Sequence, residues 1–137
     1  MIEQRVILDT SVLVSLLSKS DRNHAWAVRQ WAQVNPPALT CEAVISETCF
    51  LLKRKYLTEA VFEMIEVGAI AIAFDLQEDA GNVRVLMDRY ESVPMSFADA
   101  CLVRMSERSA NSAVMTLDGD FKIYRKHRNE EISIIQP

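Results

Sequence analysis

Four acidic residues of this sequence lie at positions where an acid is not needed for solubility. Asp9 and Asp118 each end an apolar run. Asp99 lies at the start of a predicted helix, and Glu47 lies within a strongly apolar helical segment. Buried carboxylates repel one another and are costly to desolvate, so proteins tolerate them where a divalent cation or another partner neutralises them. Hard oxygen ligands suit Mg²⁺ or Mn²⁺ together with a substrate phosphate, and phosphodiester hydrolysis is therefore the predicted chemistry.

The rest of the composition leaves few other chemistries. With only His24 and His127 in the chain, a zinc site built from histidine and cysteine is hard to assemble. The same shortage argues against a histidine pair that activates an RNA 2′-hydroxyl. The three cysteines have no metal-ligand spacing and are expected to be buried free thiols. A net charge of −4 argues against a protein that coats nucleic acid non-specifically.

Short strands and helices alternate along the chain, and these elements must position the acids. Continuous apolar runs predict strands, and apolar residues at helical spacing predict helices. The predicted strands are 6–8, 38–40, 69–74, 113–116 and 132–135, and the predicted helices are 12–17, 24–34, 41–55, 57–68, 77–91 and 96–108. This alternation predicts an α/β fold with a mostly parallel sheet covered by helices on both faces. Ligands of such sheets bind at the carboxyl ends of the strands, which is where Asp9 and Asp118 lie.

The whole chain, 1–137, is expected to form one domain. Its 137 residues, half of them apolar, are enough for one buried core. The amino-terminal residues lack the apolar core of a signal peptide, and the longest apolar stretch, 67–74, is too short to span a bilayer. We therefore expect no contact with a membrane and a location in the cytoplasm.

Four sequence fragments, taken together and in this order, resemble the PIN domains and, within them, the VapC-like toxins of bacterial toxin–antitoxin pairs. The fragments are VILDTSVL at 6–13, VISET at 44–48, SFADA at 96–100 and TLDGDF at 116–121. Each fragment alone is a weak signal, but the resemblance covers nearly the whole chain. It implies a three-layer α/β/α fold with a central, mostly parallel sheet of about five short strands.

The resemblance also implies a set of site residues and partners. Asp9, Glu47 and Asp99 would bind Mg²⁺ or Mn²⁺, Asp118 would complete the acidic set, and Asp120 is a close competitor for the fourth place. Small polar residues beside these acids, which are Thr10 or Ser11 and Thr116, would orient a carboxylate or a phosphate oxygen. The implied activity is that of an endoribonuclease that leaves a 5′-phosphate and a 3′-hydroxyl. The implied partners are an RNA substrate, a cognate antitoxin and a second copy of the chain, the last two held by helices at 24–34 and 61–67.

Several alternatives stay open from the sequence alone. Asp9 could simply cap the helix that follows it, and Ser96 with Asp99 has the spacing of a helix-capping box, although neither cap accounts for Glu47. The basic runs 53–55 and 122–128 are as typical of a solvated surface as of a phosphate-binding one. The function could also be that of an RNA-processing or DNA-directed PIN nuclease without an antitoxin, or of a PIN-fold binding module that has lost catalysis.

Overall fold

Five short parallel strands form the central sheet of this protein. The computed structural model describes residues 1–137, and the strands lie in the order β3-β2-β1-β4-β7. Their bounds are β1 (Arg5–Leu8), β2 (Ala38–Thr40), β3 (Ile70–Ile72), β4 (Ser112–Met115) and β7 (Ile134–Ile135). All four strand pairs are parallel, as the alternation of elements predicted. The last three residues of β1 are fully buried, because this central strand is covered on both faces.

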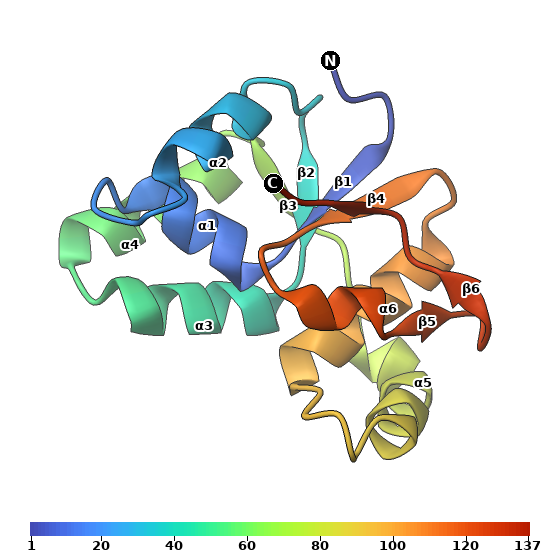
Figure 1. The fold of residues 1–137 in the computed structure, drawn as a ribbon. Coiled ribbons are helices and arrows are strands. Elements are labelled where there is room, and N and C mark those ends of the chain that lie inside the picture. Colours follow the sequence, from blue (N-terminus) through green and yellow to red (C-terminus); the bar gives the residue numbers. More distant parts are fainter.

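Helices cover both faces of the sheet (Figure 1). The first four form one layer, and α5 and α6 pack against each other on the opposite side. Their bounds are α1 (Thr10–Leu17), α2 (His24–Trp31), α3 (Glu42–Leu52), α4 (Lys55–Glu66), α5 (Leu76–Arg89) and α6 (Phe97–Arg108). All three cysteines are free thiols; Cys41 and Cys101 are buried in the core, and Cys49 is half-buried against it. None of the helices is both long and apolar enough to cross a membrane.

The structure corrects the predicted elements at three places. The helix expected over 41–55 ends earlier, as α3 at Leu52, because Lys53 has a positive φ of 62°, and the helix expected over 57–68 is α4, which begins at Lys55. Glycine is the usual residue at such a position, so the sequence does not signal that the first helix ends as early as Lys53. The last strand has two residues where four were expected. A 3₁₀ helix, η1 (Gly119–Lys122), and a hairpin of β5 (Arg125–Lys126) and β6 (Glu130–Glu131) were not predicted at all.

A buried ion cluster joins α5 to α6. The Asp79 side chain is 3% exposed and accepts hydrogen bonds from Arg104 Nε and Arg108, each at 2.8 Å. Burial by itself raises the pKa of Asp79, but the hydrogen bonds from Arg108 and Arg104 outweigh it and hold that pKa below its ordinary value. Asp79 is therefore a buried carboxylate that the protein neutralises with its own cations.

Candidate active site

Asp9 lies at the carboxyl edge of the sheet, where β1 and β4 end side by side. Leu8 pairs with Met115, and the Asp9 amide donates to the Met115 carbonyl at 3.1 Å, so the next residues of both strands meet. The Thr116 hydroxyl donates to Asp9 Oδ2 at 2.6 Å, and the Thr10 amide donates to Asp9 Oδ1 at 2.7 Å. The Asp9 residue is only 5% exposed. It caps α1 and is also joined to the strand beside it.

Two hydroxyl groups extend the network from Asp9 into the loop that follows β4. Thr116 Oγ1 accepts the Asp118 amide at 2.9 Å while it donates to Asp9. Ser11 donates to Asp9 Oδ2 at 3.2 Å and accepts the Leu117 amide at 3.0 Å. The network therefore holds the Asp9 carboxylate in one orientation and fixes the start of the loop that carries the other acids. These contacts agree with the supporting roles expected for the small polar residues.

Asp99 lies in the first turn of α6 and forms the predicted capping box with Ser96. The Asp99 amide donates to Ser96 Oγ at 3.0 Å, and the Ser96 amide donates to Asp99 Oδ2 at 3.4 Å. The Tyr124 hydroxyl also donates to Asp99 Oδ2, at 2.9 Å. Asp99 is only 8% exposed, whereas an acid that serves only as a helix cap usually lies at the surface.

Asp9 and Asp99 interact through their charges. Burial raises the pKa of Asp9 to about 6, the hydrogen bond from Thr116 opposes that rise, and the negative charge of Asp99 adds to it. Burial likewise raises the pKa of Asp99; the Tyr124 hydroxyl opposes the rise and the charge of Asp118 adds to it. The three aspartates therefore form one electrostatically linked group at the carboxyl edge of the sheet.

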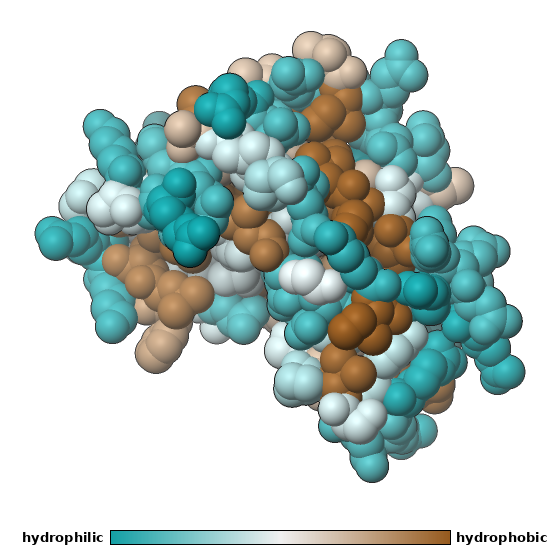
Figure 2. All heavy atoms as spheres, in the orientation of Figure 1, coloured by the Kyte–Doolittle hydropathy of each residue, from teal (hydrophilic) through white to brown (hydrophobic).

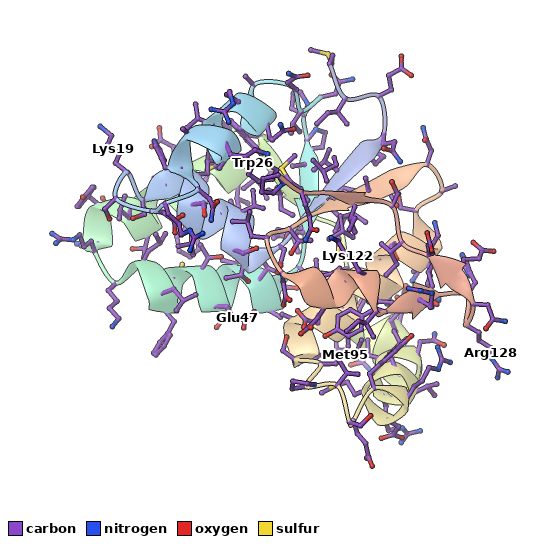
Figure 3. All side chains as sticks on the ribbon, in the orientation of Figure 1. Lys19, Trp26, Glu47, Met95, Lys122 and Arg128 are labelled. Atoms are coloured by element: carbon purple, nitrogen blue, oxygen red, sulfur yellow. The ribbon has the colours of Figure 1, made fainter.

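Glu47 is brought to the same region, but not in the environment that we expected. The sequence predicted a carboxylate close to the core, whereas the structure exposes Glu47 at the surface of α3 (Figure 3). Leu51, one of the apolar residues of the same helix, is 53% exposed as well. The Thr10 hydroxyl donates to Glu47 Oε1 at 3.1 Å, which links Glu47 to the residue that follows Asp9. Glu47 also lines a cavity of about 440 Å³ between α3 and the start of α6.

The loop after β4 carries both candidates for the fourth acidic position. Asp118 caps η1, and its Oδ1 accepts the Asp120 amide at 2.9 Å. Both residues are half-buried. The charge of Asp118 raises the pKa of Asp99, and the charges of both acids raise that of Tyr124. Asp118 is thus close enough for its charge to act on the Asp99 carboxylate.

The five acids of this region have the chemistry to bind a hard divalent cation, although their side chains do not converge on a single position. All five acids offer carboxylate oxygens, the ligands that Mg²⁺ and Mn²⁺ prefer. No three acidic, histidine or cysteine side chains lie close enough together to hold an ion as they stand. Binding would therefore require side chains to rotate inward, for which the exposed Glu47 has the most room.

Two residues of this region were missed by the sequence analysis. Tyr124 is fully buried and donates to Asp99, and Gln136 donates from Nε2 to the Asp118 carbonyl at 3.1 Å. Tyr124 lies in a basic run that resembles a solvated surface, and Gln136 follows the last strand. A buried tyrosine hydroxyl needs a hydrogen-bond partner, but no local pattern identifies the partner.

A larger cavity lies away from this site. Its volume is about 720 Å³, and it is lined by Arg5 at the start of β1 and by the Arg108–Asp79 ion pair, among other residues. Because Arg5 and Asp9 lie at opposite ends of β1, this cavity is remote from the acidic group. Its carboxylate Asp79 already has two cationic partners.

Comparison with known proteins shows the family and the fold of this chain. The sequence model of the PIN domain matches residues 6–127. The chain is 29% identical over 122 residues to "23S rRNA-specific endonuclease VapC20" of Mycobacterium tuberculosis, in the strains CDC 1551 / Oshkosh and ATCC 25618 / H37Rv, an alignment that covers 85% of this chain and 91% of each relative. The crystal structure of M. tuberculosis VapC20, described as a Sarcin-Ricin loop cleaving toxin, has the same fold, with a TM-score of 0.76. The two sequences are 22% identical, and the superposition covers 86% of this chain and 93% of the VapC20 chain. With its sheet order, its acidic group and a family match over most of its length, this chain belongs to the PIN domain family.

Proposed function

We propose that this protein is a metal-dependent endoribonuclease that hydrolyses RNA phosphodiester bonds, and that it is the toxin of a toxin–antitoxin pair. The whole chain, 1–137, acts as one nuclease domain. The observation that carries the proposal is the state of Asp9 and Asp99, which are buried and electrostatically linked yet form no ion pair with any lysine or arginine. Their neutralising charge has to come from a bound cation or a proton.

The same protein contains a control for this reasoning. Asp79 is as deeply buried as Asp9, but two arginines hold it and its pKa is lowered, whereas the pKa of Asp9 is raised. The chain therefore neutralises a structural acid with its own cations and leaves the acids of the sheet edge without any. That difference is typical of acids kept for function.

We assign the metal ligands to Asp9, Glu47, Asp99 and Asp118, with Asp120 as the alternative to Asp118. The ion is Mg²⁺ or Mn²⁺, which when bound supplies Lewis-acid stabilisation of the phosphodiester and of the leaving oxygen. Thr116 and Ser11 hold the Asp9 carboxylate in place through hydrogen bonds to Oδ2. The cavity beside Glu47 is where an RNA backbone would approach the acids.

We propose structured ribosomal RNA as the substrate class, because the relatives are named for cleavage of 23S rRNA. Two basic segments support this class of substrate. Residues 53–55 are exposed beside the break between α3 and α4, and Lys122 is exposed on η1, which begins directly after Asp118. Contacts from these residues to phosphates would position the RNA without reading its sequence. Such a substrate would be met in the cytoplasm, which is the location that we propose.

An apolar helical surface supports the proposal of protein partners. Large apolar side chains of α3 and α4 face outward: Phe50 is 76% exposed, Tyr56 66% and Phe62 53%. Figure 2 shows apolar atoms gathered over the carboxyl-terminal half of α3. Exposed apolar patches of this kind mark interfaces. We place the antitoxin contact and the homodimer face on this surface and on helix α2, where Val28 is 44% exposed.

The test is cleavage of ribosomal RNA and of a mixed set of structured RNAs by the purified protein. Each RNA is incubated with Mg²⁺, Mn²⁺ or EDTA, and the ends of the products are identified. We expect cleavage with either ion, none in EDTA, and products with a 5′-phosphate and a 3′-hydroxyl. Asp9→Asn should abolish cleavage, because it removes the negative charge while it preserves the shape of the side chain.

The matched control is Asp75→Asn, which changes an exposed aspartate that caps α5 and is not among the assigned ligands. This variant should cleave as the unchanged protein does. Cleavage that persists in EDTA, or that Asp9→Asn leaves intact, would refute the metal-site assignment. If no RNA is cut under any condition, the binding-module alternative takes the place of the nuclease.

A further inference from the structure

The buried phenol of Tyr124 has an unusual place beside the acidic group. Tyr124 is 0% exposed, and its hydroxyl donates to Asp99 Oδ2 at 2.9 Å. Its ring is fixed by edge-to-face contacts with Tyr90 and Phe121, each with ring centroids 5.2 Å apart. The hydroxyl is therefore presented to the carboxylate by a rigid aromatic cluster.

Tyr124 also connects two elements that carry acids. Its amide donates to the Asp120 carbonyl at 3.1 Å, which places the residue at the end of η1, directly after the loop of Asp118 and Asp120. Through its hydroxyl it reaches the first turn of α6, where Asp99 lies. The side chain thus bridges η1 and α6 and fixes Asp99 relative to the acids of the loop.

The two carboxylate oxygens of Asp99 differ in their hydrogen bonds. Oδ2 accepts both the Tyr124 hydroxyl and the Ser96 amide, whereas Oδ1 accepts no hydrogen bond. A carboxylate anchored through one oxygen presents the other in a defined direction. Outer hydrogen bonds of this kind orient the ligands of metal sites and raise their affinity.

We propose that Tyr124 is a positioning residue for the metal site: by holding Asp99 Oδ2 it aims Asp99 Oδ1 at the cation. The inference rests on the proposed function, since it requires Asp99 to be a ligand. Tyr124 itself touches neither the substrate nor the ion. It acts through Asp99, and its removal changes how well the site holds a cation.

Tyr90 provides a matched control within the same cluster. It is also buried, its ring packs against Tyr124, and its hydroxyl accepts the Arg125 amide at 2.8 Å. Removal of either hydroxyl costs one hydrogen bond to another protein group, but only the Tyr124 hydroxyl contacts an acid. A purely structural role of Tyr124 would make the two substitutions equivalent with respect to metal binding.

The experiment is Mn²⁺ binding by isothermal titration calorimetry to the unchanged protein, Tyr124→Phe and Tyr90→Phe. Thermal unfolding in EDTA checks that each variant is folded. Tyr124→Phe should weaken Mn²⁺ binding by about tenfold or more, the usual effect of removing an outer hydrogen bond from a ligand. Tyr90→Phe should leave the affinity unchanged.

A further pair of variants tests whether Tyr124 acts through Asp99. Asp99→Asn and the double variant Asp99→Asn/Tyr124→Phe should bind Mn²⁺ equally weakly, because the carboxylate that Tyr124 positions is gone from both. If Tyr124→Phe alone does not fold, this pair of variants still tests the proposal. The neutral amide introduced by Asp99→Asn carries no charge, so loss of the Tyr124 hydroxyl does not leave a buried carboxylate without its hydrogen-bond donor.

The outcomes separate this inference from the proposed function. If the unchanged protein binds no Mn²⁺, the metal site itself is refuted. If it binds and Tyr124→Phe binds as tightly, the site stands and the positioning role is overturned. A double variant that binds more weakly than Asp99→Asn would also overturn it, because Tyr124 would then act by another route.

Discussion

Replacing Asp9 by asparagine should stabilise the metal-free protein, even though it should destroy activity. Burial, opposed by the Thr116 hydrogen bond and reinforced by Asp99, raises the pKa of Asp9 from 3.8 to about 6. The native state therefore holds this proton more tightly than the unfolded chain does. Stability is greatest while the carboxyl is protonated in both states and falls as the pH rises between these two values.

The size of the effect follows from that difference in pKa. Each pKa unit corresponds to about 1.4 kcal/mol, so at neutral pH the charged Asp9 destabilises the fold by about 3 kcal/mol. Asparagine removes this term but turns one acceptor oxygen into a donor, which disturbs one of the bonds from Thr10, Ser11 or Thr116 at a cost of about 1 kcal/mol. The expected net gain is about 2 kcal/mol near neutral pH, and it should vanish near pH 4, where native Asp9 is already protonated.

Urea unfolding in EDTA, at neutral pH and near the ordinary pKa of aspartate, measures this gain. Added Mg²⁺ should then stabilise the unchanged protein and leave Asp9→Asn unaffected, because only the former has a complete site. The reasoning would be refuted if Asp9→Asn were less stable than the unchanged protein at neutral pH. A gain of equal size at both pH values would also refute it, since charge would then not be the cause.

Three other substitutions test the remaining polar contacts. Asp79→Ala should lower the free energy of unfolding by about 3 kcal/mol at neutral pH, because it leaves two arginines without their buried partner. Since the pKa of Asp79 is lowered, this loss should shrink as the pH falls below the ordinary pKa of aspartate; a loss in urea unfolding that is constant with pH would contradict the account. Thr116→Val should reduce the cleavage rate by about tenfold or more with an unchanged circular dichroism spectrum, because Asp9 loses its 2.6 Å donor; an unchanged rate would count against the orienting role. Ser96→Ala should cost about 1 kcal/mol in urea unfolding through loss of the α6 cap, and no change in stability would show that the capping box is dispensable.

The sheet and the places of the acids could be predicted because local signals determine both. A fully buried parallel strand is a continuous apolar run, and β1 and β4 each end at the first polar residue. Ser96 and Asp99 have the spacing of a capping box, so the start of α6 was predicted to within one residue.

The interpretation of Glu47 shows where local reasoning fails. An acid among apolar residues on a helix suggests burial, but Leu51, one of the apolar residues that supported this interpretation, is exposed like Glu47. An apolar side chain reserved for a partner has the same sequence signal as one reserved for the core.

The bond from Tyr124 to Asp99 and the hairpin of β5 and β6 depend on tertiary structure. His127 and Arg128 make the hairpin turn with positive φ, a conformation that glycine and asparagine usually signal, so neither residue indicates a turn at its position. The partner of a buried hydroxyl 25 residues away along the chain is settled only when η1 packs against α6.

The two outer strands of the sheet are very short, and this limits how copies of the protein can associate. β3 has three residues and β7 has two, so each edge offers few unpaired backbone groups to a neighbouring chain. Longer exposed edges are templates for strand addition and for aggregation. A protein with such brief edges resists growth into continuous sheets, and its specific contacts are left to the side chains of its helices.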